Sequence, residues 1–293
     1  MTQDPFTLVG IRPEEKRTVT ARKKTDFPVV SGAVLLVIVL GCLFANVIAK
    51  KDPAYLDLLH YTQAPDREFL FGTDSLGRDL FACIWYGGRV SLTIGFLATA
   101  ISTGIAVVFG AVSGAASDWV DTILMRLTEI LLSVPGLLLI LFLQAIWGEP
   151  TVLSISVIIG VTGWFSVAKV VRTEVRQIRN AEYVVASRCM GGSFLHILWK
   201  HLAPNFLSAI MFMVVMNVRS AIAAESTLSF LGMGLPLDVI SWGSMLSLSE
   251  RALMTKSWWI ILIPGAFLVT LLVCLTNIGS WLRKTAHQKE SNL

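Results

Sequence analysis

The hydrophobic residues of this chain gather into six long stretches separated by polar segments. The stretches cover residues 29–49, 90–115, 122–147, 151–168, 206–226 and 257–282. A helix needs about 20 apolar residues to cross roughly 30 Å of bilayer hydrocarbon, and in lipid the helix satisfies its own backbone polar groups. The pattern therefore predicts an all-α polytopic membrane protein with six transmembrane helices.

Two details of the apolar stretches refine this prediction. The first stretch has no charge and lacks a small-residue cleavage site followed by a soluble mature domain, so it is expected to be an anchor and not a removable signal peptide. Within the later stretches, Pro135 and Pro264 predict helix bends. Gly110 and Gly114, four residues apart, predict a face on which another helix packs closely.

Composition and charge agree with a membrane protein and give it an orientation. Hydrophobic residues make up 54% and charged residues 15%, against about 25% charged in soluble domains. The net charge of +4 gives no reason to expect a nucleic acid partner. Fifteen lysines and arginines lie in the two ends and the 169–205 connection, against seven in the other two long connections. The positive-inside rule therefore predicts that both termini are cytoplasmic.

These predictions divide the chain into five parts. They are a cytoplasmic tail at 1–28, a first transmembrane helix at 29–49, an extracytoplasmic segment at 50–89, a five-helix core at 90–282 and a cytoplasmic tail at 283–293. The core contains a cytoplasmic helical hairpin at 182–204. Because the connections near 116–121 and 148–150 are short, function is expected in the longer ones.

Four basic residues follow the fourth stretch at helical spacing: Lys169, Arg172, Arg176 and Arg179. The spacing places all four on one face, so the fourth helix is expected to continue beyond the membrane. Such a stripe faces either anionic lipid head groups or an acidic protein surface. Both interpretations put it in the cytoplasm.

The residues after this stripe read as helix, glycine break, helix and stop. A first helix runs from Glu182 to Met190, Gly191 and Gly192 break it, and a second stretch from Ser193 to Leu202 ends at Pro204. The first helix is small and apolar, with Tyr183, Ala186 and Ser187, which membrane burial does not require. A groove in a partner protein would require it.

This segment resembles the cytoplasmic coupling motif of ATP-binding-cassette (ABC) importer permeases, in which Glu-Ala-Ala is followed by Gly and Leu-Pro. Ala186, Gly191 and Pro204 match it in identity and spacing. Val185 stands at the position of the glutamate and Ser187 at that of the second alanine, while Glu182 lies three residues earlier.

Two further stretches resemble the peptide and nickel permease family, specifically the shorter, C-type permease of dipeptide, oligopeptide and nickel systems. They are Phe71-Gly72-Thr73-Asp74-Ser75-Leu76-Gly77-Arg78-Asp79 and Glu225-Ser226-Thr227-Leu228-Ser229-Phe230-Leu231-Gly232-Met233-Gly234, the second followed by Trp242-Gly243. The resemblance extends from about residue 29 to residue 282.

The resemblance implies a type I ABC importer permease fold in the bacterial inner membrane. It implies that the chain lines half of a channel for peptides, beside a second homologous permease, two ATPases and an extracytoplasmic binding protein. It also implies that ATPase coupling involves Glu182, Tyr183, Ala186, Ser187, Gly191 and Pro204. The chain has no GxxxxGK followed by Ser or Thr, so ATP and magnesium belong to the ATPases and the chain is not an enzyme.

The extracytoplasmic stretch has two interpretations: a folded elbow, or a region that receives the binding protein or gates the pathway. Its candidate residues are Gly72, Thr73, Asp74, Gly77, Arg78 and Asp79. For the elbow, Thr73 or Asp74 is expected to cap a helix that runs through Arg78.

Charges inside the apolar stretches are few. Arg126 and Glu129, three residues apart, are expected to pair or to reach the interface. Arg219 lies deep in the fifth stretch, where it should face a watery cavity, a carboxylate or an ion pair with the second permease. Glu225 is not on its helical face. Arg219, Glu225 and Phe230 are the channel or gating candidates.

Other functions have less support. A nickel or metal-chelate importer permease of the same family remains an alternative, as does a secondary transporter, which would need inverted halves and a carboxylate relay. A membrane enzyme would need clustered His, Glu or Ser, but all four histidines lie outside the stretches. The four cysteines are far apart and predict neither a disulfide framework nor a metal site. We therefore expect no catalytic, cofactor-binding or metal-binding residues.

Overall fold

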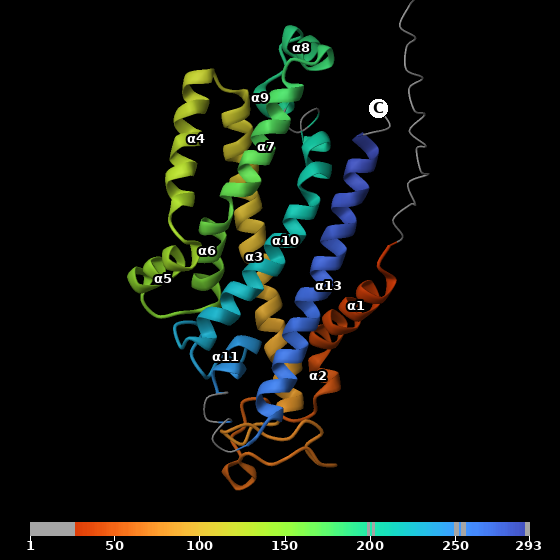
Figure 1. Ribbon diagram of the computed structural model, residues 1–293, viewed down its shortest axis with the longest axis vertical. Coiled ribbons are helices and arrows are strands. Elements are labelled where there is room, and N and C mark those ends of the chain that lie inside the picture. The colour runs from red at the N-terminus through yellow and green to blue at the C-terminus, as the bar shows by residue number, and fades with distance from the viewer. Residues whose placement is uncertain (1–26, 198–199, 201–202, 249–251, 253–255, 291–293) are drawn as a thin grey trace, which may run out of the picture.

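The computed structural model describes residues 27–197, 200, 203–248, 252 and 256–290. Within these residues the regular structure is helical, and one isolated bridge joins Thr73 to Asp79. The helices are α1 (Val29–Leu43), α2 (Ala45–Ile48), α3 (Leu80–Ala115), α4 (Asp118–Ser133), α5 (Gly136–Trp147), α6 (Val152–Gly163), α7 (Phe165–Ile178), α8 (Glu182–Cys189), α9 (Phe194–Ile197), α10 (Ala203–Phe230), α11 (Trp242–Ser247) and α13 (Trp259–Glu290), with a 3₁₀ turn at Leu58–His60 (Figure 1). The all-α prediction is confirmed.

Three described helices are long and apolar enough to cross a membrane: α3, the Ala209–Phe230 part of α10 and the Trp259–Thr285 part of α13. The number rises to five if two bent pairs each count as one span, namely α4 with α5, bent by 88°, and α6 with α7, bent by 45°. The apolar helix α1 has only 15 residues, fewer than the roughly 20 of a typical span. The predicted count of exactly six spans is not confirmed.

The two predicted proline bends have different outcomes. At Pro135 the chain breaks into α4 and α5, because proline lacks a backbone N–H and disfavours helical geometry in the residue before it. Pro264 lies within the continuous helix α13. Proline in a transmembrane helix is tolerated when its surroundings satisfy the freed carbonyl.

Helix α3 is the central element and touches α7, α6 and α10 along its length. Its glycines allow close approach. A Cβ atom at Gly110 would lie 2.6 Å from the Ala168 carbonyl oxygen, and one at Gly114 would lie 2.7 Å from the Arg172 carbonyl oxygen. The predicted close-packing glycine face is therefore confirmed, with α7 as the neighbour.

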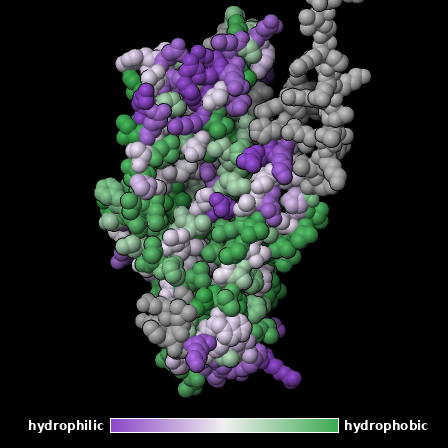
Figure 2. All heavy atoms as spheres, in the orientation of Figure 1, coloured by the Kyte–Doolittle hydropathy of each residue, from purple (hydrophilic) through white to green (hydrophobic). Residues whose placement is uncertain are grey.

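The surface is divided into two polar ends and an apolar middle (Figure 2). Helix α8 and the end of α13 lie at one end, and residues 50–79 lie at the other (Figure 1). Two helix boundaries differ from the predicted ones. Helix α3 begins at Leu80, ten residues before the apolar stretch at 90, and α13 continues through residues 283–290 of the predicted tail. Residues 1–26 of the predicted N-terminal tail lie outside the described residues.

Candidate functional site

Helix α8 presents one buried and one exposed face. Val184 and Ser187 are buried, and Val184 belongs to the same apolar cluster as Val175 of α7. On the other face Ala186 is exposed, and Met190 just beyond the helix is 82% exposed. Through Val184, α8 contributes to the apolar cluster formed by residues of α3, α7 and α10, and the exposed face leaves small and apolar groups available for a partner.

The glycine break after α8 is present as predicted. Gly191 has φ +81°, a left-handed conformation that glycine adopts without steric cost, and Gly192 N donates to the Ser187 carbonyl at 3.0 Å. Helix α9 follows, although residues 198–199 and 201–202 of the predicted second stretch lie outside the described residues. Pro204 lies in the first turn of α10, where a missing N–H removes no helical hydrogen bond. Its position just after the predicted second stretch stays a prediction, because the end of that stretch lies outside the described residues.

The remaining residues predicted to couple to an ATPase lie together on α8. Glu182 begins the helix and is exposed, and Tyr183 beside it is 47% exposed. Ser187 differs, because it is buried on the inner face and its carbonyl closes the glycine turn. Glu182 and Tyr183 are therefore available for contact with a partner, whereas Ser187 stabilises the local structure of the chain.

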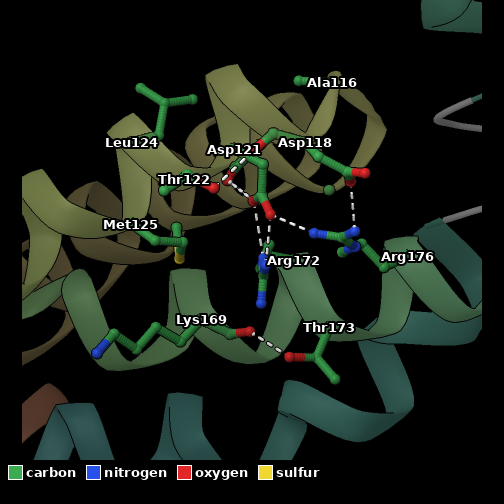
Figure 3. Close-up of polar contacts among 12 residues, drawn as sticks. Ala116, Asp118, Asp121, Thr122, Leu124, Met125, Lys169, Arg172, Thr173 and Arg176 are labelled. Atoms are coloured by element: carbon green, nitrogen blue, oxygen red, sulfur yellow. Dashed lines mark hydrogen bonds and ion pairs between the residues drawn. The ribbon is translucent and has the colours of Figure 1, made fainter.

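The basic stripe on α7 binds the chain's own α4 around Asp121, which is only 1% exposed (Figure 3). Arg172 donates to both carboxylate oxygens of Asp121, with an Nε–Oδ1 distance of 2.8 Å. Arg176 donates to Asp121 and, at 2.6 Å, to Asp118. Ser113 of α3 adds a hydroxyl donor at 2.6 Å. Paired, charge-assisted bonds of this kind fix geometry as well as supply energy.

The third arginine completes the link to α3. Arg179 Nη1 donates to the carbonyls of Gly114 and Ala116 at 3.2 and 3.0 Å, a favourable position for a cation at a helix C-terminus. Lys169 points away from Asp121 (Figure 3). The three arginines therefore need neither of the predicted partners, which were lipid head groups and an acidic surface of another protein. They bind carboxylates of α4 and carbonyls at the end of α3 in the same chain.

The 72–79 stretch is folded as an elbow. Asp74 and Arg78 are buried, and Arg78 Nε lies 2.7 Å from Asp74 Oδ2. Arg78 also donates to the Leu237 carbonyl at 3.1 Å. Gly72 and Gly77 have φ values of +75° and +76°, which the turn requires. The buried pair ties the outer loop to the segment after α10.

The predicted helix cap in this stretch is wrong. Asp79, and not Thr73 or Asp74, caps α3 by accepting from Phe81 N at 3.2 Å. Burial raises the pKa of the Asp79 carboxyl. Thr73 instead accepts from Gln63 N at 2.8 Å, and Asp74 closes its own turn by accepting from Leu76 N. The helix begins later because these side chains are occupied within the loop.

Glu225 of α10 is completely buried. Its carboxylate accepts hydroxyl hydrogen bonds from four serines: Ser241 at 2.7 Å, Ser229 at 3.0 Å, Ser91 at 3.2 Å and Ser226 at 3.3 Å. These serines come from α3, α10 and the cap of α11, so the carboxylate joins three elements. In this conformation Glu225 serves packing and lines no described cavity.

The three predicted channel residues do not come together. Phe230 is exposed at the end of α10. Arg219 makes no ion pair within the described residues, and its buried Nε has no hydrogen-bond partner there. As predicted, Glu225 is not the partner of Arg219. Arg126 and Glu129 do pair, at 2.9 Å on the surface.

A cavity of about 410 Å³ lies between α3, α5, α6 and α10. Its described lining has no charged side chain and includes six hydroxyl or amide side chains: Thr99, Ser102, Thr162, Asn217, Ser220 and Thr227. Sequence reasoning missed these residues, because serine and threonine are common in transmembrane helices and form no motif here. A polar, uncharged lining suits a ligand with neutral hydrogen-bonding groups.

Comparison with known proteins places these features in context. Residues 106–287 match the family described as "Binding-protein-dependent transport system inner membrane component". The chain is 35% identical over 246 residues to the oligopeptide transport system permease protein OppC of Bacillus subtilis, covering 84% of this chain and 78% of that protein. It is 34% identical over 267 residues to the dipeptide transport system permease protein DppC of the same organism, covering 91% and 83%. A putative peptide transport system permease protein of Brucella suis is 37% identical over 254 residues, covering 85% and 83%.

Proposed function

This chain belongs to the family of binding-protein-dependent transport system inner membrane components, and from that premise we propose that it forms half of the channel of an ABC importer for di- or oligopeptides. The observation that carries the proposal is α8, whose buried Val184 belongs to the apolar cluster that contains residues of α3, α7 and α10, while its outer face with Ala186 is exposed at one end of the molecule. An ATPase that moves this outer face would move the membrane helices with it.

The proposed assembly has four kinds of partner. A second homologous permease completes the channel, two ATPases bind the 182–204 segment, a binding protein delivers the peptide at the 50–79 end, and lipid surrounds the apolar belt. ATP and magnesium act in the ATPases, and this chain contributes no cofactor site. Gly72, Thr73, Asp74, Gly77, Arg78 and Asp79 keep the outer end folded for that delivery.

Peptide import is preferred to the nickel alternative for two reasons. The relatives named above are peptide permeases. The cavity lining, as far as the structure describes it, contains no histidine, cysteine or carboxylate, and these are the side chains that nickel sites favour. Uptake of labelled peptides by proteoliposomes holding the complete transporter tests the proposal. Accumulation of a nickel chelate without peptide uptake would favour the alternative.

We propose that both termini are cytoplasmic and that the chain crosses the bacterial inner membrane several times. In a variant with the exposed native Cys189 replaced, an impermeant thiol reagent added to intact cells is expected to label Asp66→Cys and to spare His287→Cys. Labelling after lysis provides the control for reactivity at position 287. The reverse pattern in intact cells would exclude this orientation.

We infer that Arg219 meets an anionic group that this chain does not supply, since its buried Nε lacks a partner among the described residues. If that group is an acidic peptide in the channel, Arg219→Gln should lose acidic-peptide uptake with assembly intact, while Arg219→Lys keeps part of it. If the group is a carboxylate of the second permease, Arg219→Gln should lower the yield of assembled complex. Normal uptake together with normal yield would contradict both.

A further inference from the structure

Helices α3 and α10 both line two cavities. The first, described above, is lined on α10 by residues 217–227. The second, of about 630 Å³, is lined on α10 by residues 203–218 and on α3 by residues 96–108. Since α10 runs from the α8 end toward the 50–79 end (Figure 1), the second cavity is lined by the part of α10 nearer α8 and the first by the part nearer residues 50–79.

Thr99 of α3 belongs to the lining of both cavities. The residue is only 4% exposed, and its hydroxyl has no hydrogen-bond partner among the described residues. Thr103 lies one turn further along α3 and lines the second cavity. Its buried hydroxyl also has no hydrogen-bond partner among the described residues. A buried hydroxyl without a partner is unfavourable, so two in succession call for an explanation.

Other threonines in this region show what is unusual about this pair. Threonine in a helix ordinarily donates to a carbonyl three or four residues earlier. Thr162 does so to Ile158 at 2.9 Å, and Thr227 does so to Ala223 at 2.8 Å. Both line the first cavity. Among the described threonines of this region, the hydroxyls of Thr99 and Thr103 are therefore left to bind something outside their own helix.

The spacing of these two hydroxyls suggests what they bind. Four residues of α-helix rise about 6 Å, and in an extended peptide the groups on one side of the backbone repeat about every 6.6–6.8 Å. A hydroxyl can donate to a peptide carbonyl or accept from a peptide N–H. Described side chains that line the two cavities carry no charge, so neither cavity selects for charged side chains or termini.

Resting on the peptide-import function proposed above, we propose that Thr99 and Thr103 hydrogen-bond the main chain of an extended peptide as it passes from one cavity to the other. The ligand is recognised there as an uncharged backbone. Its side chains lie against apolar and small residues, among them Ala100 and Gly104, which accept different shapes. This arrangement makes the passage tolerant of peptide sequence.

The test compares Thr99→Val and Thr103→Val with Thr276→Val in the complete transporter. All three changes replace a hydroxyl by a methyl group, but the Thr276 hydroxyl of α13 is already bonded within its own helix, to the Leu272 carbonyl at 2.7 Å, and lines neither cavity. We expect about two- to tenfold lower peptide uptake for each of the first two variants, the loss of one neutral hydrogen bond, and near-normal uptake for Thr276→Val. Thr99→Ser should restore uptake. The loss should be alike for neutral, acidic and basic peptides.

A second measurement identifies the bonded group. A peptide with one N-methylated amide, which lacks that N–H, should be imported more slowly by the unaltered transporter, and the penalty should shrink in Thr99→Val or Thr103→Val if the hydroxyl accepts from that amide. Replacing an amide by an ester, which weakens the carbonyl acceptor, tests the opposite polarity. A penalty that shrinks in neither variant for either peptide would overturn the main-chain assignment.

These measurements distinguish failure of the Thr99 and Thr103 proposal from failure of the proposed peptide-import function. Normal uptake by Thr99→Val and Thr103→Val would overturn this proposal alone. Equal losses in all three valine variants, with less assembled complex, would show that the hydroxyls serve packing, and would also overturn it. Absence of peptide uptake by the unaltered complex would overturn the proposed function, and this proposal with it.

Discussion

Replacing Asp121 by asparagine is expected to lower the thermal stability of the purified complex, because the carboxylate is buried and binds Arg172, Arg176 and Ser113. Removing a buried ion partner costs about 3–5 kcal/mol. The arginine side chains are 28% and 33% exposed, and water compensates part of the loss. We therefore expect about 1.5–3 kcal/mol, the range for hydrogen bonds to charged groups, measured as a lower apparent Tm in detergent.

Asp118 provides a matched control on the same helix. Its side chain is 81% exposed and pairs with Arg176 on the surface, and surface pairs contribute about 0–1 kcal/mol. Asp118→Asn should therefore change the apparent Tm little. Equal destabilisation by the two asparagine variants would mean that net charge near α4, and not the buried contact at Asp121, stabilises this end of the molecule.

The second large effect is expected at the proposed coupling surface. Ala186 is exposed on α8, and a contact of protein-interior density does not tolerate a large added volume. Ala186→Trp should reduce peptide uptake more than tenfold while the ATPases continue to hydrolyse ATP. Ala186→Ser should couple normally. If Ala186→Trp assembles and transports like the unaltered chain, the coupling assignment is wrong.

Gly191 should behave differently, because its backbone and not its surroundings restricts substitution. A Cβ atom there would meet nothing within 4 Å, but φ is +81°. Gly191→Val should therefore disrupt the turn and the coupling, whereas Gly191→Asn, which tolerates left-handed geometry better, should retain more uptake. Equal losses would indicate that an ATPase packs directly against position 191.

Local features of the fold could be predicted from the sequence. The turn at Gly191 was predictable because the glycines and the two flanking helices all lie within residues 182–197. The break at Pro135 was predictable because proline acts on its own backbone. The start of α3 was not, because Asp79 caps the helix only after Asp74 and Thr73 have bonded within the loop. Which of several possible side chains caps a helix depends on contacts that form only in the folded loop.

Long-range features could not be predicted in the same way. The arginine spacing identified a helical face, but Asp121, the partner of Arg172, lies 51 residues earlier. Likewise, Ser91 is 134 residues from Glu225. Ser226 and Ser229 belong to the same motif as Glu225, but the sequence does not mark Ser91 or Ser241 as partners of that carboxylate. That the Thr99 hydroxyl has no partner within the described part of the chain became apparent only when the hydrogen bonds of its neighbours were known. The hydrogen-bond partners of these side chains are set by how the helices pack, and a single sequence does not show that packing.

The corner at Pro135 bears on how the chain enters the membrane during synthesis. Helices α4 and α5 turn through 88°, and α6 and α7 then lead back to the end from which α4 departed (Figure 1). Residues 118–178 therefore begin and end at the same end of the molecule. Insertion that fixes the orientation of α3 would also fix the side on which α8 lies, where we propose that the ATPases bind.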